Sequence, residues 1–427
     1  MRAHFKAVIA VIAALLLAPL LLRADVLKIE VRDTIQPISD EFIGRALDQA
    51  GREHDEAVII ELSTPGGMLE STRSIIEKVL ASPVPVIVYV APSSARAASA
   101  GFFILESADV AAMAPGTNTG AAHPVIFGGE KMDEVMKAKM ENDAAAFIRS
   151  FVSKRGRNLE LAESAVRQSK SFTDQEALKE HLIDVIAPDI PDLLKQLDGR
   201  TITRFNGSTT VLHLAGQRVQ TLDMSLKQRI LDFMMDPNVA FILFAIGMLA
   251  LYVEFNHPGA IVPGVVGFIF VLLAVFAFNI LPTRHAALIL IVAAFVMFIL
   301  DAKFATHGAL TVGGIALMIL GALLLVDAPI PEMRVRLVTA LAVSVPMGLI
   351  TAFLVGLVIK ARRNKVVTGS QGLIGEIGTA HSGLHPEGKV FVHGELWDAV
   401  SSTDVAPGER VRVKRVDGLR LSVEPMK

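Results

Sequence analysis

Five long apolar stretches constrain this chain more than any other feature. They cover residues 239–255, 260–281, 286–300, 308–326 and 337–359, and they are nearly uncharged. A helix needs about 20 apolar residues to cross the hydrocarbon core of a bilayer, and each stretch approaches this length. The composition agrees, because 52% of the residues are hydrophobic and only 20% are charged. We therefore predict an all-α transmembrane region of about five spans at residues 239–360, in which the third stretch is short enough to be re-entrant.

Basic residues at the start of the chain and directly after the last apolar stretch predict the orientation of this region. Arg2 and Lys6 precede an apolar run at residues 7–22, so residues 1–24 have the pattern of a signal peptide or an N-terminal anchor. A basic run at residues 360–365 (KARRNK) follows the last apolar stretch and is expected in the cytoplasm. Both cues, together with five crossings, predict that the segment after residue 24 lies outside the cytoplasm and that the C-terminal tail lies inside.

Residues 25–199 alternate predicted strands with predicted helices. The strands are expected at 26–31, 57–62, 85–90 and 110–114, and the helices at 40–53, 68–80, 101–105 and 131–154. This order predicts an α/β domain with a mostly parallel sheet and covering helices. Ligands of such sheets bind at the carboxyl ends of the strands. Gly66, Gly67, Ser99 and the loop at 117–120 all fall at such ends.

The remaining segments are a linker and a small β domain. Residues 200–238 form a predicted linker with an amphipathic helix at 224–235, which either lies on the membrane surface or packs on the preceding domain. Residues 361–427 contain short alternating runs split by glycine turns, which predict an all-β barrel of the OB type. Trp397 is interpreted as a core residue of this barrel.

The composition also excludes several classes of function. The chain has no cysteine, which excludes disulfides, thiolate catalysis and cysteine-ligated zinc. Its histidines have no metal-binding spacing such as HExxH, and we predict neither a metal nor a cofactor. A net charge of −2 and few aromatic residues argue against nucleic-acid binding.

A serine within a run of small residues is the predicted nucleophile. Ser99 follows a buried strand and begins a predicted helix, where free backbone N–H groups point outward. Its small neighbours leave room for an extended peptide. The amides of Gly66, Gly67 and Ala100 are predicted to bind the oxyanion of a tetrahedral intermediate.

The residues alone do not decide which side chain acts as the general base. Lys131, Lys137 and Lys139 lie on the predicted long helix, and a lysine can accept a proton from serine only if burial keeps its amine neutral. His123 follows a strand end and needs no unusual burial to act as a base.

These motifs, in this order, resemble the long form of the NfeD family. The STPGG sequence at 63–67 resembles the family's first strand-end motif, and RAASAG at 96–101 resembles its nucleophile motif. SKRGRN at 153–158 resembles the segment that closes its long helix. PEGKV at 386–390 and GELW at 394–397 are similar to its C-terminal OB domain. The resemblance covers nearly the whole chain.

The resemblance implies a membrane-bound serine peptidase with a ClpP/crotonase-like fold. Counted back from the GRN sequence, the family's catalytic lysine falls on Lys139, which implies a Ser–Lys dyad with Ser99 as nucleophile. The implied substrates are peptides with hydrophobic segments, including the apolar C-terminal region of a stomatin- or flotillin-like partner. The implied assembly is a homodimer or a larger oligomer.

Three alternatives to the Ser–Lys peptidase remain at this stage. His123 stands where cytosolic relatives of the fold carry the histidine of a Ser-His-Asp triad, so a Ser-His peptidase is one alternative. A second alternative is a non-catalytic membrane scaffold that binds stomatin- or flotillin-like proteins. A crotonase-like acyl-CoA enzyme fits less well, because its cofactor would be scarce outside the cytoplasm.

Overall fold

The computed structural model describes residues 26–125, 133–256, 261–304, 306, 308–328, 330–363 and 370–426. The predicted signal or anchor at residues 1–24 and the lysine at position 131 lie outside these ranges. The chain divides into two compact units, which are described separately. The first comprises residues 1–295 and 316–344, and the second comprises residues 296–315 and 345–427.

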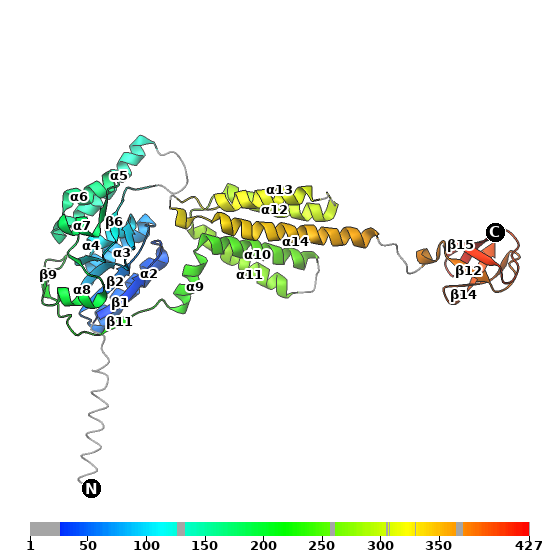
Figure 1. The fold of residues 1–427 in the computed structure, drawn as a ribbon, viewed down its shortest axis with the longest axis horizontal. Helices are drawn as coiled ribbons and strands as arrows, with labels where there is room; N and C mark the ends of the chain where they lie inside the picture. The colour runs from blue at the N-terminus through cyan, green and yellow to red at the C-terminus, as the bar shows by residue number, and fades with distance from the viewer. Residues whose placement is uncertain are drawn as a thin grey trace, which may run out of the picture. The chain divides into compact units, whose positions relative to one another are not determined.

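A six-stranded parallel sheet forms the centre of the first unit (Figure 1). Its strand order is β11-β1-β2-β3-β5-β8. The strands are β1 Val26–Val31, β2 Ala57–Leu62, β3 Val86–Val90, β5 Val110–Met113, β8 Val185–Ile186 and β11 Val219–Thr221. Both faces are covered, so the central strands β2 and β3 are buried along their whole length and, apart from Glu61, consist of apolar residues that do not alternate with polar ones. The predicted α/β fold of this region is confirmed.

Successive strand residues pack into two separate cores. On one face, Val58 and Ile60 of β2 pack against α2 to α7. On the other face, Ile59 packs against α8 and the β9–β10 hairpin. The helices are α2 Pro37–Glu53, α3 Leu69–Ala81, α4 Ala100–Ser107, α5 Glu134–Val152, α6 Leu159–Arg167, α7 Asp174–Lys179 and α8 Ile190–Leu197, and the hairpin strands are β9 Thr201–Thr203 and β10 Thr209–Val211.

A second, three-stranded sheet was not predicted. It consists of β4 Arg96–Ala98, β6 Asn118–Gly120 and β7 Ser171–Thr173, in the order β4-β6-β7. The segment at 117–120 was expected to be a loop, but most of it pairs in this sheet. Strands of three residues carry too little periodicity to be recognised in a sequence. The sheet brings the residue before Ser99 alongside Gly120.

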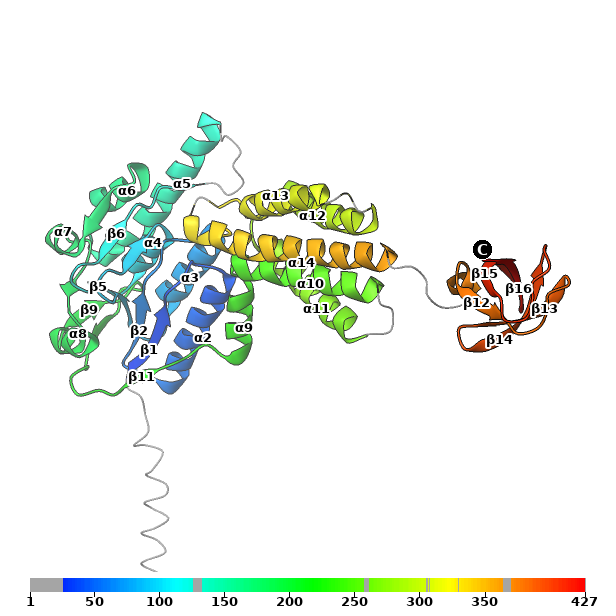
Figure 2. The same ribbon diagram turned by 45° about the vertical axis from the view of Figure 1, so that its right-hand side comes forward.

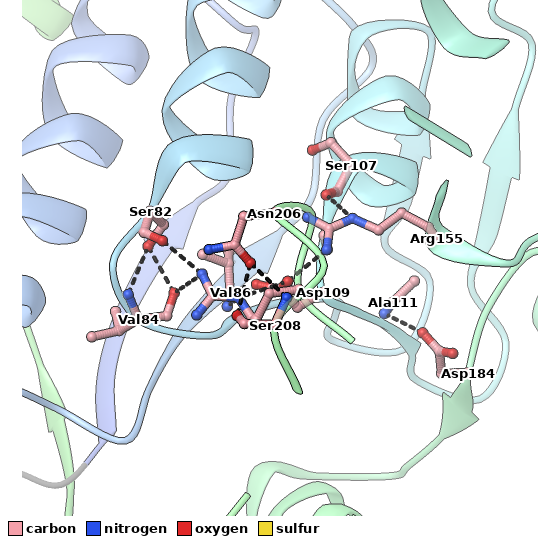
Figure 3. Close-up of polar contacts among 12 residues, drawn as sticks. Ser82, Val84, Val86, Ser107, Asp109, Ala111, Arg155, Asp184, Asn206 and Ser208 are labelled. Carbon is pink, nitrogen blue, oxygen red and sulfur yellow. Dashed lines mark hydrogen bonds and ion pairs between the residues drawn. The ribbon is translucent and has the colours of Figure 1, made fainter. Parts of the chain in front are cut away.

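A buried ion-pair network holds the C-terminal end of α4 (Figure 3). Asp109 accepts hydrogen bonds from Arg155 Nη1 at 2.6 Å and Arg204 Nε at 3.0 Å, and its other oxygen accepts from Val86 N at 2.9 Å. Arg155 Nε also donates to Ser107 O at 3.0 Å. The network therefore ties the end of α4 to the start of β3 and to the η2 turn after α5, Ser153–Arg155.

A second arginine from the SKRGRN segment completes this arrangement. Arg157 Nη1 donates to Glu106 O at 2.6 Å, and Nη2 donates to Ala108 O at 3.0 Å and to Asp184 at 3.0 Å. The last carbonyls of a helix lack intrahelical donors and attract cations. Arg155 and Arg157 therefore cap the helix whose other end begins after Ser99.

The side chain of Glu106 is fully buried in the same place. Its two oxygens have no hydrogen-bond partner among the residues that the structure describes. Burial raises the pKa of Glu106 to about 8, against an attraction to Arg157 that lowers it. The folded protein therefore keeps this carboxyl protonated at pH values where the unfolded chain has released the proton.

We expect Glu106→Gln to stabilise the protein increasingly as the pH rises from 5 to 8. Between the unfolded and folded pKa values the folded state binds more protons than the unfolded state, so the stability of the wild type falls with rising pH. One pKa unit corresponds to about 1.4 kcal/mol, so the difference reaches several kcal/mol by pH 8. Calorimetric unfolding of the full-length protein in detergent at several pH values measures it. The exposed Glu160→Gln is the control, and a pH-independent gain in Glu106→Gln would refute the expectation.

Within the described residues, six α-helices follow the α/β domain along the chain. They are α9 Leu226–Met234, α10 Pro237–Asn256, α11 Val262–Ile280, α12 His285–Phe304, α13 Ala309–Leu324 and α14 Leu337–Arg363. Three segments, Pro237–Phe255, Val262–Ile280 and Pro331–Phe353, are long and apolar enough to cross a membrane, and His285–Asp301 and Ala309–Leu324 are shorter. Helices α10 and α11 approach closely at two glycines, since a Cβ on Gly247 would lie 2.9 Å from Gly267 O.

Residues 377–425 of the second unit form a closed five-stranded barrel, as predicted. Its strands are β12 Ile377–Ala380, β13 Glu387–Val392, β14 Glu395–Ser401, β15 Arg410–Asp417 and β16 Arg420–Pro425, in the order β12-β13-β14-β16-β15. Alternate residues such as Val390 and Val392 fill the interior, and Trp397 packs against that core while half-buried.

Candidate active site

Ser99 occupies a sharp turn between β4 and α4. Its backbone has φ 53° and ψ −113°, a conformation that costs free energy for any residue other than glycine. Two hydrogen bonds hold it there: Ser99 N donates to Gly120 O at 2.9 Å, and Phe102 N donates to Ser99 O at 3.0 Å. A strained strand-to-helix turn is typical of serine nucleophiles, because it exposes Oγ beside free amides.

A cavity of about 330 Å³ opens beside Ser99. Most of its walls are apolar, as in sites that bind hydrophobic ligands. The cavity brings together Ser99, Gly67, Ala100 and His123, four of the residues that the sequence predicts for the site. Other parts of its wall come from α3, α5 and the connection between α13 and α14, at Leu69, Thr72, Met140, Ala144 and Ile330.

The two glycines after β2 have different roles. Gly66 has φ +129°, and a Cβ on it would lie 2.8 Å from Ser99 Cβ, so only glycine allows this close approach. Its N–H is not free, because it donates to Thr64 Oγ1 at 3.1 Å. This differs from the predicted role of Gly66 as an oxyanion donor. The N–H groups of Gly67 and Ala100 have no acceptor within the described ranges, and both residues line the cavity.

His123 lies half-buried in the cavity wall. Its Nδ1 is 3.0 Å from the carbonyl oxygen of Val166. Because a carbonyl only accepts, Nδ1 is the donor, and Nε2 has no hydrogen-bond partner among the residues that the structure describes. The partner of Nδ1 is therefore a backbone carbonyl and not the aspartate of a triad.

Lys139 lies outside the cavity. It is exposed on the first turns of α5, as is Lys137, and the next residue along the helix, Met140, is the one that lines the cavity. Ion pairs of Arg167 with Glu141 and of Arg73 with Asp143 hold α5 against the α/β domain, whereas the α5 residues 134–139 are all exposed. The first turns extend past the neighbouring helices of the domain (Figures 1 and 2). The lysine expected in a water-poor pocket is thus in contact with solvent.

Two further features of the site were missed in the sequence. In the sequence, Arg155 and Arg157 stand out only as part of a motif, because their hydrogen bonds to the end of α4 are tertiary contacts that no periodicity reveals. Ile330 comes from a connection between two apolar helices far along the chain. Nothing in the sequence around this residue indicates that it faces the cavity.

The sequence matches three family models that together cover most of the chain. They are described as "NfeD1b, N-terminal domain" (residues 25–192), "NfeD integral membrane domain" (238–358) and "NfeD-like C-terminal, partner-binding domain" (370–425). The chain belongs to the NfeD family. The resemblance found in the sequence is therefore confirmed, and with it a membrane protein.

Two relatives match this NfeD chain over nearly its whole length. It is 35% identical over 427 residues to the membrane-bound protease PH1510 of Pyrococcus horikoshii, covering 97% of this chain and 96% of the relative. It is 27% identical over 411 residues to the membrane protein NfeD1b of Bacillus subtilis, covering 92% and 91%.

Solved structures of the Pyrococcus protein match separate parts of the chain. A serine-to-alanine mutant of 1510-N, a membrane-bound stomatin-specific protease, is 33% identical and covers 48% of this chain and 99% of its own, with a TM-score of 0.45. A lysine-to-alanine mutant of 1510-N in complex with a substrate peptide is 32% identical. It covers 50% of this chain and 98% of its own, with a TM-score of 0.46. The C-terminal domain 1510-C is 45% identical over 14% and 97%, with a TM-score of 0.14.

Proposed function

We propose that this NfeD protein is a membrane-bound serine endopeptidase that cleaves hydrophobic peptide segments. The observation that carries the proposal is Ser99 on its strained turn, facing an apolar cavity beside the amides of Gly67 and Ala100. A relative that is 35% identical along nearly the whole chain is a protease, which supports the same class of reaction.

In the proposed mechanism, Ser99 Oγ attacks the carbonyl carbon of the scissile peptide bond. The amides of Gly67 and Ala100 bind the developing oxyanion, and each such donor contributes about 3–4 kcal/mol to lowering the barrier. The amine leaves with a proton supplied by the base, and water then releases the acyl group from Ser99 by the reverse sequence of proton transfers. Gly66 acts by letting the chain approach Ser99 closely.

Lys139 is the proposed base of a Ser–Lys dyad. A solvated ammonium keeps its proton, so Lys139 must lose its water before it can accept the proton of Ser99. Its neighbour Met140 already lines the cavity, so a peptide that fills the cavity would also cover this part of α5.

His123 is the second candidate for the base. Its favourable feature is its position in the cavity wall with Nε2 free to accept a proton. The carbonyl of Val166 orients the ring, but it stabilises the imidazolium less than an aspartate would.

The substrate and partner follow from the same features. An apolar cavity suits a hydrophobic segment, and the Pyrococcus relative is named as specific for stomatin. The match of residues 370–425 to a partner-binding domain supports a stomatin- or flotillin-like partner. We also propose a dimer or larger assembly, because the exposed first turns of α5 offer a surface for a second subunit.

Contacts among the loops of the first unit support five crossings. Arg284, between α11 and α12, pairs with Asp327 after α13 at 2.5 Å, and the backbone N–H of Arg336 before α14 donates to Asn238 at the start of α10 at 2.9 Å. These connections therefore lie at one end of the helices, on the side of the α/β domain. We propose that this domain is extracytoplasmic and that the barrel is cytoplasmic.

Leu226, Ile230 and Phe233 form an exposed apolar stripe on α9, which supports contact with the membrane surface.

The test is cleavage of a library of apolar peptides by the full-length protein in lipid nanodiscs, with products identified by mass spectrometry. We expect cuts within apolar segments for the wild type and none for Ser99→Ala. Tight binding of the peptides without cleavage would instead support the non-catalytic scaffold. The exposed position of Lys139 is the observation that favours this second function.

A further inference from the structure

One wall of the cavity comes from the connection between two apolar helices. Ile330, between α13 and α14, lines the cavity together with Ser99 and Gly67. Its Cδ1 lies 3.3 Å from the position that a Cβ on Gly66 would take, and the same position is 3.2 Å from Ser99 Oγ. A side chain from the membrane region therefore lies directly beside the nucleophile.

Several contacts fix this segment in place. Glu332 Oε1 accepts from Arg96 Nη2 at 2.6 Å, and Arg96 is in β4, the strand that leads into Ser99. Met333 is only 2% exposed, and its N–H donates to Ile330 O at 3.1 Å, which closes a 3-10 turn at Pro331–Met333. Arg334 Nε donates to Ala328 O at 2.5 Å. Contacts of residues before and after Ile330 in the chain therefore fix its position.

We infer that Ile330 is a specificity-determining residue of the peptidase, so that the membrane region helps to select the substrate. This inference rests on the proposed function. Gly66 has no side chain and lies against Ser99, so the branched apolar side chain of Ile330 supplies the cavity wall next to this contact. The substrate side chain that enters the cavity next to the scissile bond must then pack against Ile330.

This arrangement favours apolar residues of moderate size in the substrate. A β-branched side chain in the wall has a fixed shape and leaves a limited volume. Removing its methyl groups should weaken binding of a substrate that packs against them and should admit larger residues. Discrimination of about 10-fold or more is typical for a change of one methylene in an apolar pocket.

Peptide binding to the Ser99→Ala protein tests the inference without requiring catalysis. Fluorescein-labelled peptides that differ at one position, with valine, isoleucine, phenylalanine or tryptophan, are titrated with the full-length protein in nanodiscs. Adding Ile330→Ala should weaken binding of the valine and isoleucine peptides about 10-fold and shift the preference toward phenylalanine or tryptophan. Ile330→Trp should weaken binding of the larger residues most. Leu337→Ala is the matched control, because this exposed residue lies in the same part of the chain but does not line the cavity.

The ion pair of Arg96 and Glu332 provides a second test. Both side chains are nearly half exposed, so the pair is expected to change affinity only a few-fold. Arg96→Glu or Glu332→Arg alone should weaken binding of the preferred peptide, and the double exchange should restore it. Restoration would show that the contact itself, and not either side chain, positions Ile330.

The outcomes separate this inference from the proposed function. Equal peptide preferences in the Ile330 variants and the Ser99→Ala parent would overturn the inference, and so would a failure of that parent to bind any apolar peptide. Cleavage by the wild type is measured independently. If the wild type cleaves nothing while Ile330→Ala still changes the peptide preference, the catalytic proposal fails and the role of Ile330 in the cavity is retained.

Discussion

Ser99→Ala is expected to reduce cleavage of apolar peptides by about 10⁴-fold or more. The substitution removes the attacking oxygen, and the amides of Gly67 and Ala100 can then provide only residual catalysis of bound water. Alanine adds no atoms beside Gly66, so the fold should be retained. The measurement is kcat/KM of the full-length protein in nanodiscs with a fluorogenic apolar peptide.

A second serine of the same cavity provides the control for this prediction. Ser169 lines the cavity but does not begin a helix, so Ser169→Ala should keep kcat/KM within about 10-fold of the wild type. Cleavage that persists at the wild-type rate in Ser99→Ala would exclude Ser99 as the nucleophile.

Lys139→Ala is expected to lower kcat by about 10²- to 10⁴-fold, the range for loss of a general base. Lys139→Arg should be equally impaired, because a guanidinium does not release its proton in proteins. His123→Ala should stay within about 10-fold, since in the proposed mechanism His123 contributes only to the cavity wall. Lys137→Ala is the matched control, because this lysine is also exposed on the first turns of α5.

The reverse pattern would identify a different enzyme. If His123→Ala loses activity while Lys139→Ala keeps it, the base is the imidazole Nε2 and the protein is a Ser-His peptidase.

The central sheet and the barrel could be predicted because their signals are local. The β2 and β3 runs are buried throughout and apolar except for Glu61, which is typical of parallel strands buried on both faces. The barrel strands alternate, since only one face of each reaches the core. The position of Ser99 at the start of a helix could be predicted for the same reason.

The features that the sequence could not reveal depend on tertiary contacts. Whether the amide of Gly66 is free depends on the rotamer of Thr64, and the strain at Ser99 depends on a hydrogen bond to Gly120. The exposure of Lys139 was missed because helical periodicity does not tell how far a helix extends past its domain. The contribution of Ile330 was missed because the chain crosses several apolar helices before it returns to the cavity.

The exposure of Lys139 has a consequence for how such an enzyme would be restrained. In the proposed mechanism, the backbone of Ser99 is already held in its turn in the resting protein, but the amine that must activate its hydroxyl is exposed to water. Hydrophilic polypeptides that reach the cavity would then not be cleaved, because they cannot displace the water around the amine of Lys139. Only an apolar segment would remove water from the amine, so binding of the substrate would itself activate the enzyme. Other proteins would then be protected from cleavage without a separate inhibitor.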